Sequence, residues 1–245
     1  VQRNERIKSP SRIEPVGLLK CADGRIMNLA DYALPEIRGH ASIPVICVIG
    51  AGMNAGKTTA TAALISGLRQ AGWQVAGLKG TGTGAYGDYN AYTDAGAAFV
   101  GDFVDAGMVS TYLEPKDRIM AGINRLLLEA ETKGCEVAVL EIADGILQRE
   151  TAELLEDPAV RDRMAGFIYA CGDALSAVGG TNCLRGHGIT PAALTGMLSC
   201  SPLATAEAAA VTGLPVVTKK ALSDPAVASS LYHGLTTPAS EALVA

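Results

Sequence analysis

An apolar run of strand length, a glycine-rich loop and a helix follow one another from Val45 to Ala71, and this order constrains the fold more than any other feature. Val45 to Ile49 is apolar at every position, as expected for a parallel strand that is covered on both faces. Residues 57–71 repeat small and aliphatic residues at helical spacing, and Gly72 is typical of a helix end. The order therefore predicts the first strand and helix of an α/β sheet.

Further strands and helices alternate along the rest of the chain. We expect strands over 73–79, 135–141, 166–171, 193–199 and 214–218, and helices over 116–133, 151–164, 174–185 and 203–212, with an Ala-rich helix starting near Asp94 and a short last helix opened by Ser223-Asp224-Pro225. Because strand and helix alternate at this spacing, the predicted fold class is α/β, with a mainly parallel sheet and helices on both faces over residues 44–245.

Residues 1–43 differ from this domain because they are more charged and lack long aliphatic runs. Residues 16–20 and 25–29 flank the turn signal Ala22-Asp23-Gly24, which predicts a small N-terminal β-hairpin. A single hairpin is marginally stable in water. We therefore expect this leader to pack on the main domain or to be the remnant of a preceding domain.

The composition excludes several classes of protein. The chain is 49% hydrophobic and 18% charged, with a formal net charge of −5, which excludes disorder, a coiled coil and a disulfide scaffold. No Lys/Arg cluster follows residue 45, and no apolar run reaches the length of about 18 residues that a membrane span needs, so we expect neither nucleic acid nor a membrane as partner.

The six cysteines are widely spread and predict reduced thiols in a cytoplasmic protein. Cys183 and His187 have the i, i+4 spacing of two metal ligands on one helix face, but neither a CxxC motif nor a second histidine is close to them in the sequence.

The loop after the first strand has the composition of a phosphate-binding loop. Its sequence, Ala51-Gly52-Met53-Asn54-Ala55-Gly56-Lys57-Thr58-Thr59, fits the Walker A pattern with Ala at the first fixed position. The glycines allow consecutive N–H groups to turn inward as an anion nest. The helix start adds partial positive charge, Lys57 reaches the β- and γ-phosphates of a nucleotide, and the Thr58 hydroxyl can bind Mg²⁺.

The alternative interpretation of this loop is a glycine-rich turn that happens to contain Gly-Lys-Thr. The apolar strand before it and the helix after it favour nucleotide binding. The candidate phosphate-binding residues are Gly52, Met53, Asn54, Ala55, Gly56, Lys57, Thr58 and Thr59.

Two charged residues are expected at the same edge of the sheet as this loop. The helix over 57–71 runs about 21 Å away from the edge, and the strand over 73–79 returns about 23 Å, which brings Lys79 back to it. Glu141 ends an apolar run and reaches the same edge, where an acid is a common second contact for Mg²⁺. Asp144 is an alternative, but Asp-Gly is itself a turn signal, which favours Glu141. The alternative for Lys79 is a solvated lysine at a strand end.

Residues 80–94 form a stretch rich in Gly, Thr and Tyr between these strands. Its composition is too flexible for a core element, and its hydroxyl groups, including those of Thr81, Thr83 and Tyr86, suit a mobile lid or a substrate loop. The alternative, a disordered surface loop, has nearly equal support from composition.

Together these residues resemble dethiobiotin synthetase and its P-loop relatives. Those relatives include the molybdopterin-guanine dinucleotide adaptor NTPase and multi-domain proteins with an extra N-terminal domain. The resemblance rests on Ala51 to Thr59, Lys79, Thr93-Asp94-Ala95 and Leu140 to Gly145, and it covers about residues 44–218.

The resemblance implies roles for individual residues. By it, Lys57 and Lys79 are the catalytic lysines, and Thr58, Asp94 and Glu141 form the magnesium shell. Thr81 and Thr83 are implied to contact the substrate, and Tyr86 is a further candidate in the same loop.

The site residues and the resemblance predict an enzyme that depends on Mg²⁺ and ATP and activates a small carboxylate or amine by phosphoryl transfer, with GTP as the alternative nucleotide. Two other functions stay open. One is a nucleotide-dependent adaptor or switch in which residues 80–94 order around the γ-phosphate, and the other is a degenerate P-loop protein that binds another cofactor. The aliphatic surface is compatible with a homodimer.

Overall fold

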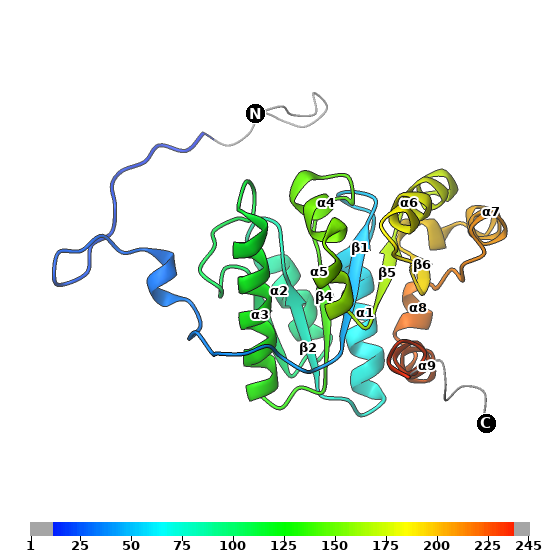
Figure 1. Cartoon of the computed structure of the whole chain (residues 1–245), viewed down its shortest axis with the longest axis horizontal. Coiled ribbons are helices and arrows are strands. Elements are labelled where there is room, and N and C mark those ends of the chain that lie inside the picture. The colour runs from blue at the N-terminus through cyan, green and yellow to red at the C-terminus, as the bar shows by residue number, and fades with distance from the viewer. Residues whose placement is uncertain (1–11, 238–245) are drawn as a thin grey trace.

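The computed structural model describes residues 12–237, which build a six-stranded sheet between two layers of helices (Figure 1). The strand order is β3-β2-β4-β1-β5-β6, and every neighbouring pair is parallel. The strands are β1 (Val45–Gly50), β2 (Val75–Lys79), β3 (Phe99–Asp102), β4 (Val137–Glu141), β5 (Gly166–Ala170) and β6 (Ala193–Thr195). The predicted α/β fold class is confirmed.

The helices alternate with the strands along the chain. They are α1 (Lys57–Gln70), α2 (Tyr86–Asp94), α3 (Lys116–Thr132), α4 (Arg149–Glu156), α5 (Pro158–Arg163), α6 (Ala174–Gly186), α7 (Pro202–Thr212), α8 (Lys219–Leu222) and α9 (Pro225–Thr236), with short 3-10 turns at Leu29–Tyr32 and Met197–Cys200.

Two hydrophobic cores cover the two faces of the sheet, and β1 contributes to both. Ile46 and Val48 pack with side chains of α1, α2 and α9, whereas Cys47 and Ile49 pack with those of α3, α4 and α6. Every residue of β1 is buried. Burial on both faces is the physical reason for the continuous apolar run in the sequence.

The connections after β1 and β4 leave the sheet on opposite sides. The chain enters α1 on one face after β1 and α4 on the other face after β4, and these two strands are neighbours. Where two neighbouring parallel strands lead into helices on opposite faces, a crevice forms at the carboxyl ends of the strands, and open α/β sheets bind ligands there. The loops after β1, β2 and β4 meet at this edge.

The prediction of a helix that starts near Asp94 is wrong. The structure instead ends α2 at Asp94, because Gly96 adopts a φ of +87° and turns the chain out of the helix. The N–H of Ala98 then donates to the carbonyl of Val75 and leads into β3, a strand that the sequence did not indicate. The predicted loop over 80–94 is therefore half helix.

Three other boundaries also differ from the prediction. The helix expected over 151–164 is divided, because Pro158 has no N–H and the side chain of Asp157 caps the next helix. The strand expected over 193–199 ends after three residues, where Gly196 turns with a φ of +90°. Residues 214–218 form a single parallel bridge, between Val216 and Leu194, instead of a strand.

The N-terminal segment carries the predicted hairpin as one antiparallel bridge, between Lys20 and Ile26. Figure 1 shows this segment standing away from the sheet, and Val16 in it is fully exposed. Closer to β1 the chain is held against the domain by hydrogen bonds: the N–H of Leu34 donates to the backbone carbonyl of Asp105, and the N–H and hydroxyl of Ser42 donate to the Glu131 carboxylate. The predicted division into residues 1–43 and 44–245 stays a prediction, and its parts 1–11 and 238–245 lie outside the described residues.

Within residues 12–237, no helix combines the length and the apolar composition that crossing a membrane requires.

A substitution at Gly67 tests the packing of α1 against α8 and α9. A Cβ atom there would overlap the carbonyl oxygen of Leu222 and come within 2.7 Å of the Ala228 side chain. We expect Gly67→Ala to lower the free energy of unfolding by about 1–3 kcal/mol through overpacking. Gly179 in α6 has open space around it, so Gly179→Ala is the control and should raise stability by up to about 1 kcal/mol. Urea unfolding measures both, and a Gly67→Ala variant as stable as the parent contradicts the packing.

Candidate functional site

The phosphate loop, residues 51–59, turns from β1 into α1 through left-handed backbone conformations. Gly56 has a φ of +103° and Asn54 a φ of +63°. Lys57, the first residue of α1, is buried, and its Nζ donates a hydrogen bond of 2.8 Å to the carbonyl oxygen of Gly52. The ammonium group therefore lies over the loop, beside the positive end of the α1 dipole.

The other predicted phosphate-binding residues differ in exposure. Met53, Asn54 and Thr59 are exposed, Gly52, Gly56 and Thr58 are half-buried, and Ala55 is buried.

Glycines from two other loops support the phosphate loop. A Cβ atom on Gly196 would overlap the carbonyl oxygen of Ala55, and one on Gly145 would lie 2.5 Å from the carbonyl oxygen of Ala51. The N–H of Met197 donates to the carbonyl of Ala55 at 3.1 Å. These close approaches fix a backbone turn of the kind that forms anion nests.

Lys79 and Glu141 lie side by side at the ends of their strands. They are direct partners in the register of β2 and β4, and Glu141 is also paired with Val48 of β1. Both side chains are buried, with 8% of Lys79 and 2% of Glu141 exposed. The expected return of Lys79 and Glu141 to one edge follows from this register.

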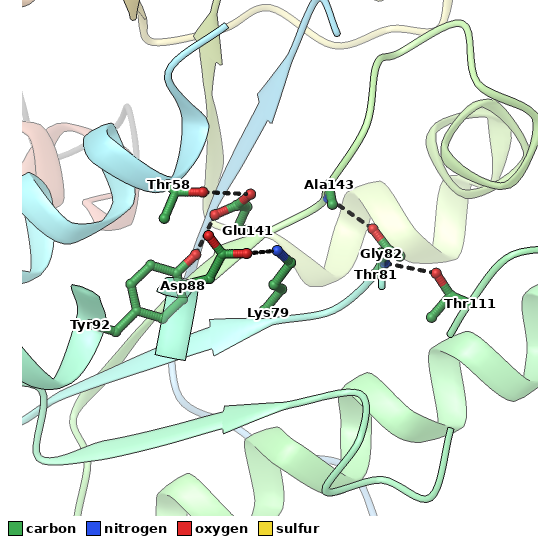
Figure 2. Close-up of polar contacts among 9 residues, drawn as sticks. All are labelled: Thr58, Lys79, Thr81, Gly82, Asp88, Tyr92, Thr111, Glu141 and Ala143. Atoms are coloured by element: carbon green, nitrogen blue, oxygen red, sulfur yellow. Dashed lines mark hydrogen bonds and ion pairs between the residues drawn. The ribbon is translucent and has the colours of Figure 1, made fainter. Parts of the chain in front are cut away.

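Glu141 accepts hydrogen bonds on both carboxylate oxygens (Figure 2). The Thr58 hydroxyl donates to Oε1 at 3.3 Å, and the Tyr92 hydroxyl donates to Oε2. Tyr92 comes from α2 and is almost completely buried. A buried carboxylate needs such partners, because an unpaired one would be costly to desolvate.

Lys79 forms an ion pair with Asp88 in the first turn of α2. Figure 2 shows the Asp88 carboxylate and the Lys79 ammonium facing each other beside Glu141. Helix α2 thus supplies two partners of the site, Asp88 and Tyr92, four residues apart and so on one helix face.

Burial changes the ionisation of two groups in this cluster. It lowers the pKa of Lys57 from its ordinary value, while the carboxylates of Glu141 and Asp144 act in the opposite direction. It also raises the pKa of Tyr92 well above its ordinary value, and Glu141 adds to that effect. Tyr92 is therefore a protonated hydrogen-bond donor at neutral pH.

Asp94 does not join this cluster. It is exposed at the last turn of α2, six residues and so about 9 Å along the helix axis from Asp88. The helix carries it away from the ligand edge and toward the beginning of β2. The acid that the structure brings to Lys79 is Asp88, and the sequence signal for it, the pair Asp88 and Tyr92 at i, i+4, is visible only once a helix is assigned from Tyr86.

The three candidate substrate contacts in residues 80–94 differ in burial and in their partners. Thr81 is buried, and its Oγ1 accepts a 2.8 Å hydrogen bond from the N–H of Ala143. Thr83 is exposed and bridges to Ser110. Tyr86 is 82% exposed and lines a neighbouring cavity. Thr81 therefore ties the loops after β2 and β4 together (Figure 2).

A cavity of about 410 Å³ lies near the Lys79–Asp88 pair, although neither of these residues lines it. It lies between the start of α2 and the end of β3, and its lining residues are Gly84, Ala85, Tyr86, Tyr89, Asp102, Val104 and Asp105. Asp102 is the register partner of Lys79 in β3. Burial raises the pKa of Asp102 from its ordinary value, and the adjacent Lys79 acts against that shift.

The donor set at Glu141 suits magnesium. Among the described residues, no three His, Cys, Asp or Glu side chains gather into a metal site, and Cys183 and His187 make only a contact of 3.9 Å with each other. Mg²⁺ prefers oxygen ligands and is commonly held by one or two carboxylates together with substrate phosphates. The Thr58 hydroxyl and the Glu141 carboxylate provide such oxygens beside the phosphate loop.

Comparison with solved structures decides the fold. The chain is similar to the signal recognition particle 54 kDa protein from Aeropyrum pernix K1 in complex with GDP, with 19% identity and a TM-score of 0.52 over 79% of this chain and 49% of that chain. The chain has a P-loop NTPase fold. A second similar structure is the signal recognition particle receptor FtsY from Elizabethkingia anophelis, with 13% identity, a TM-score of 0.45, and coverage of 81% of this chain and 56% of that one.

The P-loop chain spans about half the length of each of these two proteins, and at such identities the likeness concerns the fold alone. A scan against protein-family models and a search of curated proteins gave no match. The finer resemblance to dethiobiotin synthetase stays a prediction.

Substitutions of Thr81 test whether its hydroxyl group stabilises the fold. Thr81→Val keeps the shape but leaves the buried N–H of Ala143 without its acceptor, so we expect a loss of about 1–3 kcal/mol in the free energy of unfolding. Thr81→Ser keeps the hydroxyl and should lose less than the valine variant. Equal stability of the valine variant and the parent protein in urea unfolding would contradict this role.

Proposed function

We propose that this chain binds a nucleoside triphosphate with Mg²⁺ at the phosphate loop and transfers the γ-phosphoryl group to a small-molecule acceptor, with the nucleoside diphosphate as the leaving group. The observation that carries the proposal is the convergence of Lys57, Lys79, Thr58 and Glu141 at one edge of the sheet. ATP is the nucleotide we propose first. GTP is the alternative, because the similar Aeropyrum pernix protein was solved in complex with GDP.

The two lysines have distinct tasks in this proposal. Lys57 and the backbone of the loop hold the β- and γ-phosphates at the start of α1, where the helix dipole adds positive charge. Lys79 neutralises charge that develops on the transferred group. An ammonium group has three donors, so the bond from Lys79 to Asp88 leaves two for phosphate oxygens.

Thr58 and Glu141 would hold the magnesium ion. A bound Mg²⁺ would neutralise charge on the β- and γ-phosphate oxygens. Glu141 has capacity for it, because a carboxylate has about four acceptor sites and two are used by Thr58 and Tyr92.

The acceptor is proposed to lie in the cavity near the Lys79–Asp88 pair. Its volume of about 410 Å³ falls in the range of small-molecule sites. Of the two predicted acceptor classes, a small amine fits the wall better than a carboxylate, since Asp102 and Asp105 both line the cavity.

A nucleotide-dependent switch is the second candidate. It is favoured by one observation, namely that α2 contacts both Lys79 and Glu141 through Asp88 and Tyr92. A switch requires a large difference between diphosphate and triphosphate in the proteolysis of residues 80–94. Equal cleavage with both nucleotides, together with transfer or release of phosphate, would favour the enzyme.

Isothermal titration with Mg²⁺·ATP and Mg²⁺·GTP, followed by an assay of nucleoside diphosphate formation with and without small amines, tests the proposed function. We expect Lys57→Ala to weaken triphosphate binding at least about tenfold, because it removes a charge-assisted contact to phosphate. Lys79→Ala should lower turnover about a hundredfold, with a smaller effect on binding.

The matched control is Lys133→Ala, since Lys133 is an exposed lysine at the end of α3 that pairs with Glu129. Its binding and turnover should equal those of the parent protein. Equal turnover of the parent, Lys57→Ala and Lys79→Ala proteins would overturn the proposal.

A further inference from the structure

Tyr92 and Asp88 touch the charged groups of the site, although neither belongs to the phosphate loop or to a strand end. Tyr92 is 1% exposed and donates to Oε2 of Glu141, and Asp88 pairs with Lys79. Both come from α2, four residues apart. The proposed function gives neither residue a direct contact with nucleotide or acceptor.

The packing holds Tyr92 in one position. A Cβ atom on Gly77 of β2 would lie 2.9 Å from Cβ of Tyr92 and 2.8 Å from Cδ1 of Ile65 in α1. The glycine therefore lets the tyrosine lie close against the sheet, next to α1. A donor fixed in this way orients its acceptor, because a buried side chain has few alternative rotamers.

The hydrogen bond from Tyr92 leaves the opposite oxygen of Glu141 for other partners. Oε1 faces the Thr58 hydroxyl, and Oε2 is bound by Tyr92 (Figure 2). A carboxylate held on one oxygen cannot rotate about its terminal bond without breaking that hydrogen bond. Oε1 and Thr58 are the pair that the proposed function assigns to magnesium.

We propose that Tyr92 and Asp88 are positioning residues of the phosphoryl-transfer site, Tyr92 for the metal-binding carboxylate of Glu141 and Asp88 for the ammonium group of Lys79. This inference rests on the proposed function. It makes α2 the element that orients both charged groups from one face, while Tyr86 and Tyr89 of the same helix line the cavity. The two residues have separable effects, because they act on different groups.

Tyr92→Phe tests the first half of the inference. Phenylalanine keeps the packing and removes the hydroxyl, and a hydrogen bond to a charged group is worth about tenfold or more in an equilibrium constant. We expect the affinity of the protein·ATP complex for Mn²⁺, a spectroscopic substitute for Mg²⁺ measured by electron paramagnetic resonance, to fall at least about tenfold. Binding of ATP in the presence of EDTA should stay unchanged.

Tyr169→Phe is the matched control. Tyr169 is also buried and donates to the carbonyl of Ser176 at 3.2 Å, on the β5 and α6 side of the fold. We expect its Mn²⁺ affinity to equal that of the parent protein. Mn²⁺ affinity that is unchanged in Tyr92→Phe, or equally reduced in both tyrosine variants, would overturn the role of Tyr92.

Asp88→Asn tests the second half. We expect turnover to fall about tenfold while Mn²⁺ affinity is retained, because the variant affects Lys79 and leaves the metal ligands in place. A loss of Mn²⁺ affinity would make Asp88 a metal ligand and overturn its positioning role, as would unchanged turnover. If the parent protein binds neither Mg²⁺·ATP nor Mg²⁺·GTP, the proposed function fails as well. If the parent binds and the variants behave like it, this inference alone fails.

Discussion

The parallel register between β2 and β4 is the constraint on which the site depends. It pairs Lys79 with Glu141, and the register of β4 with β1 puts Glu141 beside the strand that leads into the phosphate loop. A shift of one residue would turn each of these side chains to the other face of the sheet. Because both faces of these strands are apolar, side-chain size rather than polarity opposes such a shift: Tyr92 of α2 and Ile65 of α1 occupy the space that a side chain at the position of Gly77 would need. The packing of the core therefore fixes the spacing of the charged groups.

Close backbone contacts complete the arrangement that the register begins. Gly145 and Gly196 approach the phosphate loop where a side chain would not fit. Thr81 connects the loops after β2 and β4 through the N–H of Ala143. The segments around Gly145 and Gly196 therefore contact the phosphate loop, and Thr81 holds the first of them in place. Such support keeps a site ready for a ligand without a rearrangement of its framework.

Much of this arrangement follows from the sequence. The continuous apolar runs identify buried parallel strands, and the topology of an α/β sheet then brings Lys79 and Glu141 to the edge at which Lys57 lies. These inferences succeed because burial on both faces leaves a strong signal in the sequence.

The predictions that were wrong also have physical causes. Helix α2 was missed because its first turn follows a run of glycines, whereas the Ala-rich residues after Asp94 look helical but contain Gly96 in a left-handed conformation. The misplaced helix explains why Tyr92 was not considered. Asp94 was expected at the site from the resemblance to dethiobiotin synthetase, whereas the structure places it in the exposed last turn of α2 and pairs Asp88 with Lys79. Positions that depend on a tertiary contact, such as Thr81 with Ala143, leave no local pattern to recognise.

A crystal structure of the protein with Mg²⁺ and a non-hydrolysable ATP or GTP analogue would show directly whether the two lysines converge on one phosphate. We expect the γ-phosphate within hydrogen-bonding distance of Nζ of both Lys57 and Lys79, with the metal ion held by Thr58 and Glu141. A nucleotide bound away from the phosphate loop, or a γ-phosphate that Lys79 does not contact, would contradict this expectation.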